Sequence, residues 1–318
     1  MNSPFARLTA VRASGFSVVG AAVLLGLLGS GAPRFVFAQA GSAISLAPLT
    51  FELTANPGET VENVVRVYNN GDQPVTVVMQ VQDFAAAGER GEVVLQEADN
   101  HTFSLASWVS VEPTDFVLPA KEFKPVTFKV ALPPNAEPGG HYGTVLASVT
   151  GVASGTGAAL AQKIGSLILL QVPGVISEQL ALASLEAPGF SEYGPVTLTA
   201  RFKNDGSVHL KPRGFVLVKG MTGREVARLD IPQQNVLPTS VRRIDVDFLG
   251  KWHWGRYTAT LTAIYGSTNE PLSASVAFWI FPWKVSLAVL IAAFIVLYAL
   301  YRGRRRLAAA GRVLVKGS

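Results

Sequence analysis

The stretch from residue 196 to residue 206 reads VTLTARFKNDG, and it determines the fold that we expect for the central part of the chain. Its apolar residues alternate with polar ones, at Val196, Leu198, Ala200 and Phe202. A period of two places the apolar side chains on one face of a β-strand and leaves the other face to water. The strand then enters Asn204-Asp205-Gly206, where Asn and Gly tolerate the positive φ of a tight turn.

The same alternation recurs through the rest of residues 41–280, where a period of 3.6 residues is almost absent. It is clear in residues 75–82, 126–130 and 257–263. Turns rich in Gly, Pro and Asn separate these stretches at the spacing expected of a β-sandwich. The pattern predicts roughly eight or nine strands before Pro173 and about seven after it.

A short internal repeat indicates that this β-structure is built twice. Residues 66–71 read RVYNNG and residues 201–206 read RFKNDG, so each matched position lies 135 residues further along the chain. Both stretches carry an alternating strand into an Asn-x-Gly turn. We therefore predict an all-β fold of two immunoglobulin-like β-sandwich domains, at residues 41–173 and 174–280, followed by one C-terminal transmembrane helix.

The C-terminal apolar run provides the evidence for that helix. Residues 285–301 read VSLAVLIAAFIVLYALY and contain no charge. Together with the apolar residues before it, this run is long enough as a helix to cross the roughly 30 Å of a bilayer's hydrocarbon core. Trp283 and Tyr301 stand at its two boundaries, as interfacial aromatic residues do, and Lys284 can extend its amine to the headgroups. We assign the membrane span to residues 281–301.

A basic tail, residues 302–318, follows the span, and its arginines cluster at Arg302, Arg304, Arg305 and Arg306. Positive charge beside a membrane helix stays on the cytoplasmic side. The sequence therefore predicts a single-pass protein of the plasma membrane, with its sandwiches outside the cytoplasm and its C-terminus inside. The alternative is a buried helix of a soluble domain, which the arginine cluster disfavours.

The first 40 residues are typical of a secretory signal peptide. A positively charged start is followed by an apolar core at residues 16–29, and Ala38-Gln39-Ala40 supplies the pattern that a signal peptidase requires. The core is too short to cross a bilayer comfortably. We expect cleavage before Gly41, with an uncleaved anchor as the alternative.

The distribution of charge argues against a nucleic-acid partner. The chain has a net charge of +5, but all 22 Asp and Glu residues lie between Glu52 and Glu270. Ten of the 27 Lys and Arg residues lie outside that stretch, so the middle of the chain is acidic. The positive charge flanks the apolar segments, where membranes favour it. The chain also has no cysteine, which excludes disulfides, thiol catalysis and cysteine-based metal sites.

One region has a more specific pattern, which consists of WVSVEP at 108–113, FVLP at 116–119, KPVTFKV at 124–130 and PGGHYG at 138–143. It resembles the N-terminal domain of WxL-interacting proteins, a family once labelled a domain of unknown function and described as peptidoglycan-binding. The resemblance covers residues 42–172 and is looser over 178–280. It implies a signal peptide, two β-sandwiches, a C-terminal membrane helix and a basic tail. It also implies binding to cell-wall peptidoglycan and to other surface proteins.

Catalytic motifs are absent from the sequence. The four histidines have no spacing typical of a shared metal, and no nucleophile elbow, Walker loop, dinucleotide fingerprint or EF-type calcium loop occurs. We therefore expect no enzymatic activity, no metal and no cofactor.

Exposed aromatic side chains are the remaining candidates for ligand contact, because their apolar faces stack on sugar rings. The candidates are Trp108, Tyr142, Trp252 and Trp254. Each also has a purely structural interpretation: a sandwich normally buries one tryptophan, and Lys251–Gly255 equally suits a packing surface close to the membrane.

The function that the sequence favours is that of a membrane-anchored extracytoplasmic binding or scaffold protein. Its partners would be peptidoglycan, other surface proteins or both, with the lipid bilayer contacted by the helix. An accessory structural subunit of a membrane transport or secretion complex is the main alternative. A surface hydrolase is the least favoured one.

Overall fold

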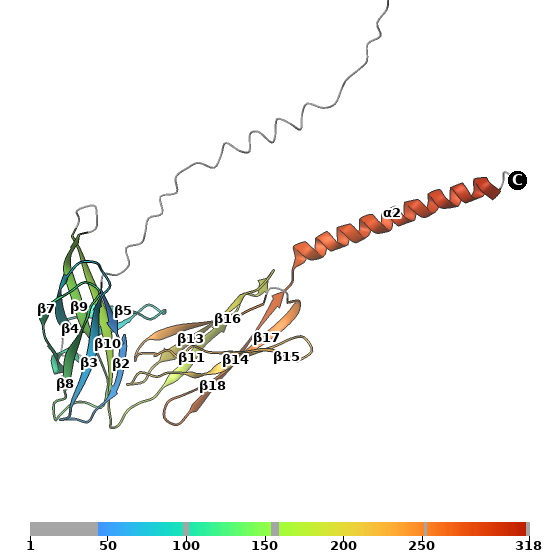
Figure 1. Cartoon of the computed structure of the whole chain (residues 1–318). Helices are drawn as coiled ribbons and strands as arrows, with labels where there is room; N and C mark the ends of the chain where they lie inside the picture. Colours follow the sequence, from blue (N-terminus) through green and yellow to red (C-terminus); the bar gives the residue numbers. More distant parts are fainter. Residues whose placement is uncertain (1–43, 98–101, 154–158, 251–252, 316–318) are drawn as a thin grey trace, which may run out of the picture. The chain divides into compact units, whose positions relative to one another are not determined.

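The computed structural model describes residues 44–97, 102–153, 159–250 and 253–315. Its strands form two β-sandwiches that follow one another along the chain, and a helix ends the described part (Figure 1). The predicted all-β fold with one C-terminal apolar helix is thus confirmed. The predicted signal peptide and its cleavage site lie outside the described residues.

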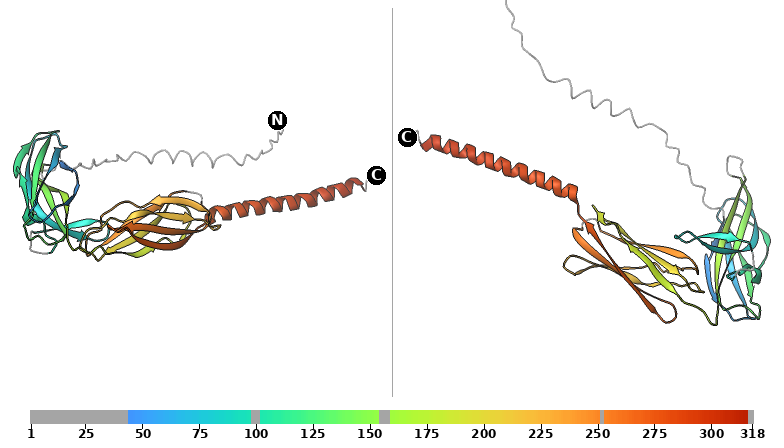
Figure 2. Two further views of the ribbon diagram at one scale, coloured as in Figure 1. Left: turned by 90° about the horizontal axis from the view of Figure 1, so that it is seen from below. Right: turned by 180° about the vertical axis from the view of Figure 1, so that it is seen from behind.

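The first sandwich consists of two sheets, which further views show from other sides (Figure 2). One sheet has the order β1 (Ile44–Ala47), β3 (Thr60–Asn69), β8 (Phe123–Ala131), β6 (Val109–Glu112). The other has the order β2 (Thr50–Thr54), β10 (Ala159–Val172), β9 (Gly139–Ala153), β4 (Val75–Ala87), β5 (Glu92–Gln96). Strand β7 (Asp115–Leu118) also pairs with β4, and a short 3-10 helix, η1 (Ala106–Trp108), precedes β6.

The second sandwich repeats this order with fewer strands. Its smaller sheet is β11 (Leu180–Glu186), β13 (Val196–Asn204), β16 (Val241–Phe248). Its larger sheet is β12 (Phe190–Ser191), β18 (Glu270–Ile280), β17 (Gly255–Tyr265), β14 (Arg213–Lys219), β15 (Glu225–Asp230).

The two sandwiches are topological copies of each other. Strand β11 takes the place of β1, β13 that of β3, and β16 that of β8. In the larger sheets β2 runs parallel to β10, and β12 runs parallel to β18 in the same way. The strand counts differ slightly from our expectation, because the apolar stretch at 44–54 divides into two strands that pair with different sheets. The two-residue strand β12 was also too short to recognise in the sequence.

Each sandwich buries a core of its own. In the first, the alternating residues of β3 and β8 meet those of β9 and β10, with Phe128 and Ile168 fully buried. In the second, the decisive strand β13 buries Val196, Leu198 and Phe202 against β16, β17 and β18. The period of two in the sequence therefore corresponds to the inward faces of the sheets.

Charged contacts join the first sandwich to the second. Arg201 Nε lies 2.8 Å from Glu89 Oε2, and Glu89 belongs to the β4–β5 turn. Lys211 Nζ lies 2.7 Å from Glu52 Oε1 on β2, and that carboxylate also accepts a hydrogen bond from Asn235. No local sequence pattern indicates these pairs, because their members lie more than a hundred residues apart.

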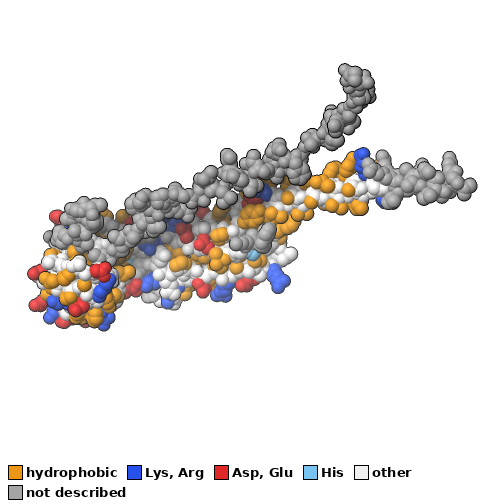
Figure 3. Space-filling view, turned by 45° about the horizontal axis from the view of Figure 1, so that its top comes forward, with side chains coloured by type: hydrophobic (Ala, Val, Ile, Leu, Met, Phe, Trp, Pro, Cys, Tyr) orange, Lys and Arg blue, Asp and Glu red, His pale blue; other side chains and the backbone are white. Residues whose placement is uncertain are grey.

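Helix α2 (Trp283–Val315) begins two residues after β18 ends. Its part from Trp283 to Arg304 is long enough and apolar enough to cross a membrane, and its side chains are unburied (Figure 3). All the residues predicted to border the span lie on this helix, from Trp283 and Lys284 to Tyr301 and the arginines 302–306. The amine of Lys284 is not free, since it lies 2.8 Å from a carboxylate oxygen of Glu192.

Candidate binding cleft

A buried carboxylate fixes the loop that leads into the 3-10 helix η1. Asp83 lies on β4 and is fully buried. Its Oδ1 accepts hydrogen bonds from the backbone N–H groups of Leu105 (2.8 Å) and Ala106 (2.7 Å), and Ser104 Oγ donates to its Oδ2. Hydrogen bonds to an ionised acceptor are stronger than neutral ones. They therefore hold η1, and Trp108 at its end, firmly against the sheet.

Trp108 packs on a histidine that is itself held in place. The ring centroids of Trp108 and His141 lie 4.5 Å apart at an interplanar angle of 47°. His141 is buried on β9, and its two ring nitrogens each lie 3.0 Å from a backbone carbonyl oxygen, of Ser104 and of Glu137. Trp108 also packs against the hydrophobic core of the first sandwich, so it has a structural role there. Part of its ring nevertheless stays accessible.

That accessible part borders a cleft of about 380 Å³ on the first sandwich. The lining combines one aromatic residue with hydroxyl, amide and carboxylate groups, and it consists of Thr102, Ser104, Ser107, Trp108, Pro133, Asn135, Ala136, Glu137 and His141. Asn135 and Glu137 are exposed at its rim. Hydroxyl and amide groups both donate and accept hydrogen bonds, whereas an ionised carboxylate only accepts. This set suits a ligand that carries hydroxyl and amide groups beside an apolar face.

Tyr142, which we expected to be exposed, is buried with only 3% of its surface accessible. Its ring packs near Phe84 (6.0 Å) and Phe103 (6.1 Å), and its hydroxyl lies 3.4 Å from His209 Nδ1. Burial raises the pKa of the Tyr142 phenol. Neighbouring residues of a strand face opposite ways, so His141 borders the cleft while Tyr142 does not. Residues from distant loops cover Tyr142, which the alternation of β9 does not reveal.

The other two candidate tryptophans lie in the sequence between strands β16 and β17. Trp252 lies outside the described residues. Trp254 is 68% exposed, and its ring centroid lies 5.4 Å from that of Phe281. The cleft beside Trp108 does not include Trp254 among its lining residues. The four candidates therefore do not form one site in the described part of the chain.

Sequence reasoning missed several residues of this cleft. Asp83 continues the inward series of Val77 and Met79 on β4, and a carboxylate at such a position requires partners when it is buried. The inward position of Asp83 in this alternation was the signal from which the sequence could have identified it. Asn135 and Glu137 lie between the prolines of the family-like pattern, but nothing in the sequence alone shows that they approach Trp108.

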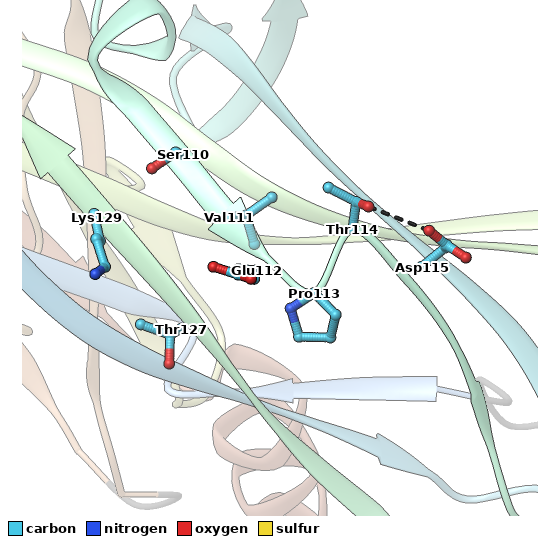
Figure 4. Close-up of a pocket in the computed structure, with 8 residues that line it drawn as sticks. All are labelled: Ser110, Val111, Glu112, Pro113, Thr114, Asp115, Thr127 and Lys129. Carbon is cyan, nitrogen blue, oxygen red and sulfur yellow. Dashed lines mark hydrogen bonds between the residues drawn. The ribbon is translucent and has the colours of Figure 1, made fainter.

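A second cleft of about 410 Å³ lies at the edge strand β6, where the chain crosses to β7 (Figure 4). Glu112 and Asp115 supply carboxylates, and Thr114 donates a hydrogen bond of 3.2 Å to Asp115. Lys129 also lines this cleft, and its amine forms an ion pair of 3.1 Å with Glu62. Its lining carries no aromatic ring, so it lacks a stacking platform. Among the residues that the structure describes, no group of three His, Cys, Asp or Glu side chains could hold a metal ion.

Comparison with known proteins identifies no family for this chain and finds similarity to solved structures in fold alone. No family model and no curated protein matches the chain. Solved structures that it resembles include the class 5 fimbriae chaperone CfaA, with 14% identity over 73% of this chain and 98% of that one (TM-score 0.37). They also include a structure of the chaperone–tip adhesin complex CsuC–CsuE of Acinetobacter baumannii, with 12% identity over 74% and 98% (TM-score 0.36). The likeness concerns the immunoglobulin-type sandwich alone. The resemblance to WxL-interacting proteins stays a prediction.

Proposed function

We propose that this chain is a membrane-anchored binding protein that holds the cleft beside Trp108 outside the plasma membrane to bind cell-wall peptidoglycan. The observation that carries the proposal is the cleft itself. The half-buried side chain of Trp108 stands among hydroxyl, amide and carboxylate groups, at the end of a loop that the buried Asp83 fixes. Such a rigid frame lowers the conformational cost of binding.

The chemistry of peptidoglycan matches this lining. Its sugar rings present apolar C–H faces, which stack on tryptophan, and its hydroxyl and N-acetyl groups need donors and acceptors. Ser107, Asn135 and Glu137 supply these groups at the rim of the cleft. The predicted family resemblance, whose pattern covers Trp108 and residues 138–143, points to the same ligand.

The helix supplies the anchor in this proposal. The span from Trp283 to Arg304 is apolar and unburied, and arginines follow it at its C-terminal end. Arginines beside a span stay in the cytoplasm, so both sandwiches would lie on the opposite side of the membrane. Peptidoglycan lies on that side.

A pull-down with insoluble peptidoglycan tests the proposal. Full-length protein in detergent should co-sediment with the polymer, and Asn135→Ala combined with Glu137→Gln should weaken binding by about tenfold or more. Both residues are exposed, so the variant should keep its unfolding midpoint. Glu112→Gln in the second cleft is the matched control. Equal binding by the rim variant and the wild type, or release of soluble fragments from the polymer, would contradict the proposal.

A second candidate function, protein binding by strand addition, rests on one further observation. Strand β5 pairs with β4 alone in the described part of the chain, and all five of its residues are exposed. Val93, Val94 and Leu95 give this edge an apolar character. An unprotected apolar edge accepts an extended segment of another protein. Val94→Lys should abolish capture of a surface protein while leaving peptidoglycan binding unchanged.

A further inference from the structure

The end of the second sandwich from which helix α2 starts carries an unusual set of exposed apolar side chains. We call this set the apolar rim. Its members are between 47% and 72% exposed, and they are Phe190, Met221, Leu249, Trp254, Trp279 and Trp283. Four of the five tryptophans in the whole sequence lie between residues 252 and 283.

Contacts place the rim residues at one end of the sandwich although they come from separate strands and turns. Phe190 and Trp279 are register partners in β12 and β18. The Trp254 ring contacts Phe281, directly before the helix. A side chain added at Gly255 would meet Met221 Sδ at 2.8 Å, which places the β14–β15 turn beside the start of β17. These relations place Phe190, Trp279, Trp254 and Met221 at the end of the sandwich from which the helix starts.

The framework beneath the rim is rigid, and it leaves the ring of Trp254 on the outside. The hydroxyl of Tyr257 lies 3.2 Å from the backbone nitrogen of Trp254 and 3.3 Å from its carbonyl oxygen. His253 stacks on Phe248, with 4.5 Å between ring centroids. The hydrogen bonds with Tyr257 hold the backbone at Trp254. Trp254 is therefore 68% exposed although its backbone is held by hydrogen bonds.

The helix determines how close this rim comes to a membrane. Only Phe281 and Pro282 separate β18 from α2. The N–H of Phe281 donates to the carbonyl of Ser191 (3.0 Å), and Lys284 forms an ion pair with Glu192 (2.8 Å). The first turn of the helix is thus tied to the sandwich. Once the helix is inserted, its first residues lie at the headgroup level, and the tied sandwich end must lie there as well.

We propose that the apolar rim docks into the headgroup region of the bilayer and holds the second sandwich against the membrane surface. Tryptophan rings favour this region because one end is apolar and the other can donate a hydrogen bond to water or headgroups. Arg256 lies opposite Trp279 in the β17–β18 register and is exposed, which suits anionic headgroups. The proposal rests on the membrane anchoring proposed above, and it adds a second contact with the lipid.

Spin labels on the full chain test the docking, and the absence of native cysteine makes single labelling clean. The protein is reconstituted into vesicles of phosphatidylethanolamine and phosphatidylglycerol with a label at Met221→Cys. The control is Thr268→Cys, an exposed position in the β17–β18 turn at the opposite end of the sandwich. The label at 221 should be at least about threefold less accessible to a water-soluble nickel complex than the label at 268, and more accessible to oxygen.

A variant separates docking from other causes of protection. Leu249→Asp combined with Trp254→Asp should restore nickel accessibility at the 221 label, whereas Leu49→Asp in the first sandwich should not. Equal nickel accessibility at 221 and 268, or protection from both nickel and oxygen as in a protein contact, would overturn the docking. Flotation of the same vesicles tests the anchor independently. Protein that floats with an accessible 221 label refutes the docking alone, and protein that does not float refutes the anchor and the docking together.

Discussion

Asn69 and Asn204 occupy equivalent positions in the two sandwiches and make the same hydrogen bonds. Each is buried at the last residue of its strand, β3 or β13. Each side-chain Oδ1 accepts a hydrogen bond of 2.9 Å from the glycine two residues later, Gly71 or Gly206. Each Nδ2 donates to the carbonyl four residues later and to a distant segment, at Leu118 and Pro119 for Asn69 and at Val236 for Asn204. The motifs at residues 66–71 and 201–206 therefore form the same hydrogen-bonded end of a strand in both sandwiches, and we call this arrangement the device.

Replacing either asparagine should destabilise its sandwich strongly. Asn204→Ala leaves the buried carbonyl of Val208 without its donor and the buried N–H of Gly206 without its acceptor, while the carbonyl of Val236 keeps the N–H of Leu210. We expect a loss of about 2–4 kcal/mol in the free energy of unfolding, since each unsatisfied buried group costs about 1–3 kcal/mol. Asn69→Ala should act similarly. Urea unfolding of the full chain in detergent measures the loss, and a change below about 0.5 kcal/mol in both variants would contradict it.

The two glycines of the device should differ in their tolerance of alanine. A Cβ at Gly206 would lie 2.4 Å from the carbonyl oxygen of Ser177 and 2.9 Å from the nitrogen of Gln179, both backbone atoms. A Cβ at Gly71 would meet only the Asn69 Oδ1 at 3.1 Å. We expect Gly206→Ala to cost about 1–3 kcal/mol and Gly71→Ala clearly less. Thermal melts of the two variants compare them directly, and the reverse order would refute this interpretation.

The sequence located this device because its constraints are mostly local, but the positive φ that we expected in the turn is wrong, since neither Asn204 nor Gly206 is among the described residues with a positive φ. An alternating strand, an asparagine and a glycine two residues later are visible in RFKNDG without any tertiary information. The same reasoning failed at Tyr142, whose burial depends on Phe103 and His209, residues that distant segments bring to it. Strand alternation defines two faces but not what covers them. The helix was predictable for the opposite reason, since a long uncharged apolar run is visible in the sequence without any tertiary partner.

The buried carboxylate of Asp83 should be essential for the order of the cleft. Asp83→Asn keeps the size of the side chain but replaces one acceptor oxygen by an NH₂ group, which must face a donor. We expect a loss of about 2–3 kcal/mol in stability, together with faster proteolysis within residues 102–108. Limited proteolysis with mass spectrometry locates the cut. Asp115→Asn is the control, because Asp115 is an exposed carboxylate on β7. Equal cutting in both variants would show that Asp83 does not hold the loop.

Acidification should weaken the contact between the two sandwiches through His209. Burial lowers the pKa of His209 below its ordinary value of about 6.5, and Glu52 opposes this only partly. The unfolded chain then binds the proton more readily than the folded one. Stability is therefore complete above about pH 6.5 and falls as the pH drops from there towards the lowered pKa.

The chain offers a control for this pH dependence. His209→Gln removes the titrating ring that faces Tyr142, so its unfolding midpoint should change less between pH 7.5 and pH 5.5 than that of the wild type. Glu52 acts in another range, because its hydrogen bond from Lys211 lowers its pKa and its contribution is lost only in stronger acid. Identical slopes for wild type and His209→Gln between pH 7.5 and pH 5.5 would exclude His209 as the cause.

The arginines at the end of the span predict the orientation of the chain in the membrane, and single cysteines can test this prediction. Thr268→Cys lies in an exposed turn of the second sandwich, and Ser318→Cys marks the C-terminus. In spheroplasts a membrane-impermeant maleimide should label position 268 at once and position 318 only after detergent is added, because the arginine-flanked side stays in the cytoplasm. If position 318 but not position 268 is labelled in intact spheroplasts, the orientation of the protein in the membrane is the reverse of the predicted one. The Trp108 cleft would then face the cytoplasm, where no peptidoglycan is present, and the proposed function would fail with it.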